Sequence, residues 1–182
     1  MVERIWKLFN EETTRIDELR RRVNHDLLTG LPNRDYFMSY FRAHLMATET
    51  AQCGVLVLIR LSDLNNMNAV LGRIETDNLL REVGQIANDF SRQYEDALPG
   101  RIKAGEIAIM LAGECDADKV LQQVSAILKA QLLEKRPGLT DIYQLGAVRF
   151  ERAGNLVEIL SRIDHALTLA EGLGPNSSYA LE

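Results

Sequence analysis

A short break near the amino terminus divides this chain into two parts of different character. In the segment 26–34, Gly30 and Pro32 both disfavour a continuous helix, and Asn33 has a side chain suited to a helix N-cap. We therefore expect one helix to end before the break and another to begin at Arg34. Residues 1–25 then form one unit and residues 26–176 a second, with 177–182 left as a linker or an appended tail.

The first unit is a polar helix with a narrow apolar seam in a 4-3 spacing. The seam consists of Ile5, Phe9, Ile16, Leu19 and Val23. A stripe this thin would bury poorly against a globular core, and its spacing is typical of a two-stranded coiled coil. We expect a signalling helix that makes a homodimer. Trp6 lies off the seam and favours the alternative, a helix folded back on its own domain.

The second unit carries strand and helix patterns in turn. Residues 54–61 form a nearly continuous apolar run, which indicates a central strand buried on both faces. Residues 101–111 have the pattern of a β-hairpin with a tight turn at Ala104 and Gly105. A further strand is expected at 141–150, and helices at 34–46, 63–71, 75–94, 116–133 and 156–171. This order predicts an α+β fold, with a mainly antiparallel sheet flanked by helices.

Composition excludes several classes of function. The 182 residues are 46% hydrophobic and 26% charged, as in ordinary globular proteins, and the net charge of −5 gives no basic field for nucleic acid. No apolar run reaches the roughly 18 residues that a membrane-spanning helix needs. Cys53 and Cys115 lie in apolar contexts without the spacing of metal ligands. We expect them to be buried free thiols in a reducing compartment.

The break at 26–34 has a counterpart near the carboxyl terminus. That segment contains Asp164, His165, Ala166, Leu167, Ala170, Gly174 and Asn176. Together with the spacing of Asn68, Gly72 and Asp77, both segments resemble the GGDEF family, whose members condense two GTP into cyclic di-GMP. The resemblance covers roughly residues 26–176 and implies the nucleotidyl-cyclase-like fold of that family.

The resemblance also implies a metal site, which this sequence lacks. Phosphoryl transfer between two nucleotides depends on Mg²⁺, which prefers carboxylate ligands. The family's metal-binding Asp after the first strand corresponds to Arg60, and the second acidic position to Ser62. The five signature positions correspond to Lys103, Ala104, Gly105, Glu106 and Ile107. Only Glu106 retains an acid of the signature, so we expect no catalysis, no bound metal and no cofactor.

The nucleotide contacts of the family are retained only in part. The positions of its phosphate-binding cations are occupied here by Asn65, Glu171 and Pro175. Because none of these residues is positively charged, the attraction for a triphosphate is lost. Asn68 and Asp77, in contrast, match the residues that hydrogen-bond the guanine base in identity and spacing. Alternatively, Asp77 caps or supports the following helix and Asn68 is an exposed polar residue.

The product-binding Arg-x-x-Asp motif of the family is absent in register. Tyr94 and Ala97 occupy its two expected positions. Arg92 with Glu95 or Asp96 would be at most a distorted remnant.

Two functions therefore compete. The chain resembles the GGDEF part of LapD-type inner-membrane receptors, which implies an inactive regulatory domain that docks on an attached or neighbouring EAL-type domain. Such a domain would be cytoplasmic, reaching the membrane only through other parts of a longer protein. The alternative is a GTP-sensing domain that uses Asn68 and Asp77 to activate a linked phosphodiesterase. An active cyclase would need carboxylates that are missing around Arg60 and Gly105.

Overall fold

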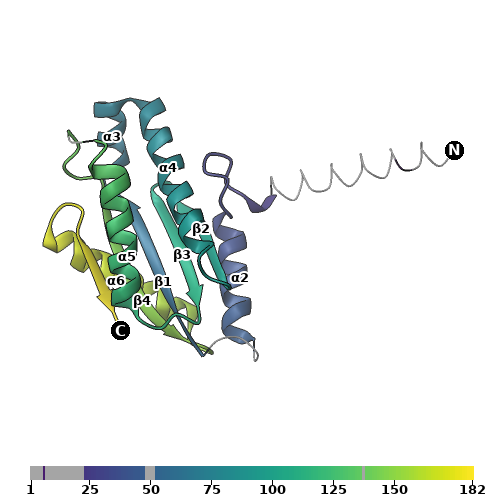
Figure 1. The fold of residues 1–182 in the computed structure, drawn as a ribbon. Coiled ribbons are helices and arrows are strands. Elements are labelled where there is room, and N and C mark those ends of the chain that lie inside the picture. The colour runs from purple at the N-terminus through teal and green to yellow at the C-terminus, as the bar shows by residue number, and fades with distance from the viewer. Residues whose placement is uncertain (1–5, 7–22, 48–51, 137) are drawn as a thin grey trace.

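A five-stranded sheet forms the centre of the molecule in the computed structural model, which describes residues 6, 23–47, 52–136 and 138–182 (Figure 1). The strand order is β2-β3-β1-β4-β5. The strands are β1 (Cys53–Leu61), β2 (Ala97–Lys103), β3 (Glu106–Ala112), β4 (Tyr143–Glu151) and β5 (Ser178–Leu181). The pairs β1–β3, β1–β4 and β2–β3 are antiparallel, and β4–β5 is parallel. The fold is thus the expected α+β class with a mainly antiparallel sheet.

Helices cover both faces of this sheet, and Figure 1 shows α4 and α5 in front of it. The helices are α2 (Arg34–Met46), α3 (Leu64–Leu71), α4 (Arg73–Ser91), α5 (Ala117–Leu128) with a π-helical extension (Lys129–Leu133), and α6 (Leu156–Leu173). Side chains alternate between faces along β1, so Val55 and Val57 join the core under α4 and α5, whereas Leu56 and Leu58 join the core with α2 and α6. This double burial explains the continuous apolar run in the sequence.

Side-chain caps begin two helices where the sequence predicts them. Asn33 Oδ1 accepts a hydrogen bond from the Tyr36 N–H at 3.0 Å, and Asp116 Oδ1 accepts one from the Lys119 N–H at 2.8 Å. The N-cap prediction for Asn33 is confirmed, and Asp116 caps the helix that was expected to begin there. The interpretation of Asp77 as a cap is wrong, because α4 begins four residues earlier, at Arg73.

The carboxyl-terminal segment is more ordered than expected. Residues 177–182 were predicted to be a linker or tail, but Ser178–Leu181 forms β5 at the edge of the sheet, paired with residues 145–148 of β4. Asn176 sets up this pairing: its Oδ1 accepts from the N–H groups of Ile142 and Tyr143, at 2.9 and 3.2 Å. A four-residue strand whose partner is over thirty residues away leaves no periodic signal in the sequence.

The two cysteines also differ from the prediction. Cys53 and Cys115 are half-buried and form a disulfide, so the expectation of buried free thiols was wrong. The antiparallel pairing of β1 with β3 brings the start of β1 beside the end of β3, and Cys115 follows three residues after that end. The Cα–Cα distance of 5.6 Å is typical of a disulfide.

Most of the predicted coiled-coil seam lies outside the described residues, namely Ile5, Phe9, Ile16 and Leu19. Of the described residues in this part, Trp6 and Val23 are helical and exposed. The coiled coil therefore stays a prediction. Among the described residues, no helix combines the length and apolar character needed to cross a membrane.

Candidate functional site

The end of β1 and the β2–β3 hairpin bring the expected site positions together. Arg60 pairs across the sheet with Glu106 on β3 and with Gln144 on β4. The predicted tight turn at Ala104 and Gly105 is confirmed and connects β2 to β3. The Arg60 side chain therefore lies beside the remaining acid of the signature, at the edge where the family would hold a metal.

Arg60 is bound by three carboxylates. Its Nε lies 3.0 Å from Glu106 Oε1, and its two terminal nitrogens lie 3.0 Å from Glu171 Oε1 and 3.3 Å from Asp164 Oδ1. Arg60 is 27% exposed and Glu106 is 9% exposed, so solvent screens the Arg60–Glu106 pair only partly. Burial disfavours the charged guanidinium, but the carboxylates of Glu171 and Glu106 outweigh it and raise the pKa of Arg60.

These residues do not fit a divalent cation. The acid oxygens nearest to the expected metal position already face a guanidinium, which stays charged at every physiological pH. A magnesium ion in the same place would meet a fixed positive charge instead of free carboxylates. Within the described ranges, no group of three or more His, Cys, Asp or Glu side chains is arranged to hold a metal ion.

Two acids of α6 belong to this cluster, which was not predicted from the sequence. Asp164 was noted only as part of the closing segment, and Glu171 only as a lost cation. They are seven residues apart, close to two helical turns, and so lie on the same side of α6. That spacing was the available signal, but it did not identify Arg60 as their common partner.

The turn of the hairpin leaves little room at the position of the family's acidic side chain. Gly105 corresponds to the third signature position, and a Cβ added there would lie 3.1 Å from Leu64 Cδ1 of α3. The Gly105 carbonyl accepts a hydrogen bond from the Leu61 N–H at 2.8 Å. Lys103 extends from the first signature position and its Nζ lies 3.2 Å from Glu106 Oε2. A second cation is therefore bound to the same remaining acid.

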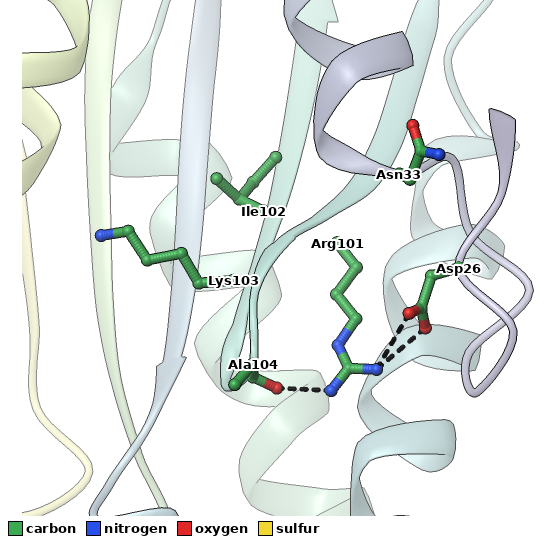
Figure 2. A pocket seen from close by; sticks show the side chains of 6 residues that line it. All are labelled: Asp26, Asn33, Arg101, Ile102, Lys103 and Ala104. Atoms are coloured by element: carbon green, nitrogen blue, oxygen red, sulfur yellow. Dashed lines mark hydrogen bonds and ion pairs between the residues drawn. The ribbon is translucent and has the colours of Figure 1, made fainter. Parts of the chain in front are cut away.

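A cavity of about 370 Å³ lies on the other side of the hairpin (Figure 2). In this view Arg101 points toward Asp26, whereas Lys103 extends away from both. Arg101 Nη1 lies 2.9 Å from Asp26 Oδ1, and Arg101 Nη2 donates to the Ala104 carbonyl at 2.6 Å. Both cations beside this cavity are thus paired with acids, Arg101 with Asp26 and Lys103 with Glu106.

Asp26 ties the opening segment to the hairpin. Its carboxylate accepts hydrogen bonds from the backbone N–H and the hydroxyl of Thr29, both at 2.8 Å, as well as from Arg101. Burial alone would raise the pKa of Asp26, but these hydrogen bonds outweigh it and lower that pKa below its usual value. The ionised carboxylate is therefore part of the folded structure.

The other positions at which this sequence departs from the family make structural contacts or face solvent. The Ser62 hydroxyl donates to Asp141 at 2.7 Å and lies 2.9 Å from Gln144 Oε1. Asn65 is exposed on α3, and Pro175 is exposed after α6. Ile107 is buried in β3 as part of the core.

The two residues that match the guanine contacts lie on neighbouring helices. Asn68 is exposed on α3 and Asp77 is half-buried on α4, and the two helices pack together. A cavity of about 300 Å³ lies nearby, lined by Val70, Leu71, Glu75, Arg136, Gly138 and Leu139. Neither Asn68 nor Asp77 lines it, so this cavity is not the expected base pocket.

The possible remnant of the product-binding motif is used for packing. Asp96 accepts a hydrogen bond from the Tyr40 hydroxyl at 3.0 Å and lies 3.6 Å from His44 Nδ1, both on α2. Arg92 instead pairs with Asp89 at 3.6 Å. Arg92 and Asp96 thus face different partners and do not form one anion-binding pair.

The fold and this site define the class of protein. The family described as diguanylate cyclase, GGDEF domain, matches residues 23–177, and the chain belongs to this family. Among curated proteins, the cyclic di-GMP phosphodiesterase PdeR of Escherichia coli K12 is 26% identical over 166 residues. That match covers 88% of this chain but only 24% of PdeR.

Two solved structures show the same fold. The coiled coil and GGDEF domain of DgcB from Caulobacter crescentus, solved with c-di-GMP, has a TM-score of 0.80 at 18% identity and covers 99% of this chain and 97% of that one. The S helix–GGDEF–EAL structure of Vibrio cholerae LapD bound to c-di-GMP has a TM-score of 0.73 at 24% identity. This chain covers 38% of that LapD chain, and 90% of this chain is matched.

Proposed function

We propose that this chain is a catalytically inactive GGDEF domain that serves as a regulatory module in cyclic di-GMP signalling. The main support for this proposal is the position of Arg60. It lies where the family is expected to bind a metal ion, and it pairs with Glu106, Asp164 and Glu171. Phosphoryl transfer without metal ions or phosphate-binding cations would leave the charge of two triphosphates uncompensated. A domain with this arrangement retains the fold but lacks the chemistry.

We propose that the domain regulates by docking on an EAL-type domain, either in the same chain or in a neighbouring protein. Support comes from the likeness to LapD, whose chain contains an S helix, a GGDEF domain and an EAL domain, and from the match to PdeR, of which this chain spans about a quarter. We propose a cytoplasmic domain of an inner-membrane protein, dimerised through its amino-terminal helix. The domain would hold its EAL partner in an autoinhibited arrangement until the dimer changes geometry.

This docking is tested by the affinity of the EAL-type partner for cyclic di-GMP, measured with and without this chain. If docking holds the partner in a state that does not bind, the apparent affinity falls in proportion to the fraction that is docked. We expect several-fold weaker binding in the presence of this chain, and no change with an active GGDEF domain added as a control. Equal affinity of the partner alone, with this chain and with the active GGDEF domain would contradict the docking model.

A second function is favoured by one observation, the retained pair Asn68 and Asp77. Since Asn68 is exposed and Asp77 does not cap α4, both side chains are compatible with contacts to a base. A GTP-sensing domain would bind GTP without turnover, whereas a relay domain would not bind it. Calorimetric titration with GTP separates the two: micromolar binding that Asn68→Ala removes supports the sensor, and absence of heat supports the relay.

A further inference from the structure

Cys53 and Cys115 connect two segments that are far apart in the sequence. Cys53 begins β1, Cys115 lies in the turn before α5, and 62 residues separate them. They are the only two cysteines of the chain, and both are half-buried. Small thiols and disulfides in solution can therefore reach the pair, which a fully buried bond would prevent.

We propose that this pair is a reversible thiol–disulfide switch, which responds to the glutathione redox state and sets how firmly the start of α5 is held to β1. The switch lies at the end of β1 opposite to Arg60, so it is separate from the site of the lost chemistry. It requires that the fold persist in both redox states and that the two states differ in stability.

Contacts that do not involve the sulfur–sulfur bond hold this region together. The Gly113 N–H donates to the Cys53 carbonyl at 2.9 Å, and Glu114 Oε1 accepts from the Cys115 N–H at 3.0 Å. Lys119 Nζ lies 2.7 Å from Glu114 Oε2, which fixes the turn to the first part of α5. As a free thiol, Cys115 can donate weakly to the Gly113 carbonyl, 3.8 Å from its sulfur. The dithiol form therefore keeps the same backbone arrangement.

The exchange is balanced by glutathione as the only co-reactant. The thiolate of one cysteine attacks a sulfur of oxidised glutathione, forming a mixed disulfide and releasing one glutathione thiolate. The second cysteine, as thiolate, attacks the protein sulfur of that mixed disulfide and releases the second glutathione. The two protein thiols are oxidised and one glutathione disulfide is reduced to two thiols. Excess reduced glutathione reverses both steps.

Oxidation closes a loop that contains β1, α3, α4, β2 and β3. A cross-link across a loop of this length restricts the unfolded chain much more than the folded one. We expect the oxidised protein to melt at a temperature higher than the reduced protein by on the order of 10 °C.

The experiment equilibrates the folded protein in glutathione buffers that run from fully reduced to fully oxidised. Each sample is quenched by alkylation, weighed intact by mass spectrometry and melted in parallel. The expected result is a single chain that carries two alkyl groups in reducing buffers and none in oxidising buffers, where its mass is two hydrogen atoms below that of the unmodified dithiol. The two alkyl groups should return after reduction, and the oxidised protein should melt at the higher temperature. Cys53→Ser and Cys115→Ser, which retain a small polar side chain, should melt like the reduced protein in every buffer.

Three results would overturn the proposal. A protein that stays fully alkylated, or that forms only mixed or intermolecular disulfides in oxidised glutathione, has no switch. A disulfide that excess reduced glutathione cannot reduce would be a permanent structural cross-link and not a switch. Melting temperatures that follow the buffer in the serine variants would show that the effect does not come from the pair.

Discussion

At the scale of single residues, two opposite charge changes contact each other. Arg60 stands where the family has a metal-binding acid, and Glu171 stands where it has a phosphate-binding cation. The two side chains are 3.0 Å apart, so each neutralises a charge that would be unfavourable alone. The resulting pair is compatible with folding and incompatible with Mg²⁺ bound to a triphosphate.

Replacing Arg60 with alanine should destabilise the protein. Glu106, which is only 9% exposed, would lose its closest partner, and Asp164 and Glu171 would lose the cation that they share. We expect a loss of about 1–3 kcal/mol in the free energy of unfolding, measured by urea denaturation. Arg92→Ala, which removes an arginine that is 72% exposed, is the matched control and should change stability little. Equal effects of the two substitutions would show that the cluster does not contribute.

The lowered pKa of Asp26 predicts a loss of stability in acid. Because the folded pKa lies below the unfolded one, the ionised carboxylate stabilises the fold above the usual carboxyl range, and this contribution is lost as the pH falls through the folded pKa. Asp26→Asn should therefore be less stable than the parent near neutral pH by about 1–2 kcal/mol. The difference should shrink in acid. Unfolding free energies at several pH values test this, and a constant difference would contradict it.

At the scale of elements, local patterns predicted most of the fold. The buried run of β1, the hairpin turn at Ala104 and Gly105 and the caps at Asn33 and Asp116 each carry their signal within a few residues. The features that were missed depend on distant contacts. β5 pairs with a strand more than thirty residues away, the disulfide joins residues 62 apart, and Arg60 binds partners that the fold alone brings to it.

Asn176 offers a test of the junction between α6 and β5. Its φ of 54° is a left-handed conformation that costs most residues energy, and its amide accepts from two backbone N–H groups and donates to the Thr140 carbonyl at 2.7 Å. Asn176→Ala should lose about 2–3 kcal/mol of unfolding free energy, seen by thermal or urea denaturation. Asn176→Gly relieves the backbone cost alone and should lose less. A glycine variant as unstable as the alanine variant would assign the whole effect to the hydrogen bonds.

At the scale of the whole molecule, β1, which lies in the middle of the sheet (Figure 1), has the disulfide of Cys53 at its start and the charge cluster of Arg60 near its end. The predicted function needs the helix to dimerise, because the relay acts through a change in dimer geometry. The family match covers residues 23–177 and does not include most of the predicted helix. The prediction that this helix dimerises rests on the spacing of its apolar residues.

Changing Ile16 and Leu19 to aspartate should abolish the coiled-coil dimer, because two charges would enter its apolar seam. Sedimentation would then show monomers at concentrations where the parent chain dimerises. The thermal stability of the globular part should stay the same, which serves as the control. A dimer that survives both substitutions would mean that the seam is assigned incorrectly.

The proposed loss of the cyclase reaction can be tested by measuring product formation. The purified chain is incubated with GTP and Mg²⁺, beside an active diguanylate cyclase, and cyclic di-GMP is measured by chromatography. We predict that no product forms, because Arg60 is bound where the metal would have to lie. Cyclic di-GMP that appears with this chain and disappears with Glu106→Gln would show that the domain is an active cyclase.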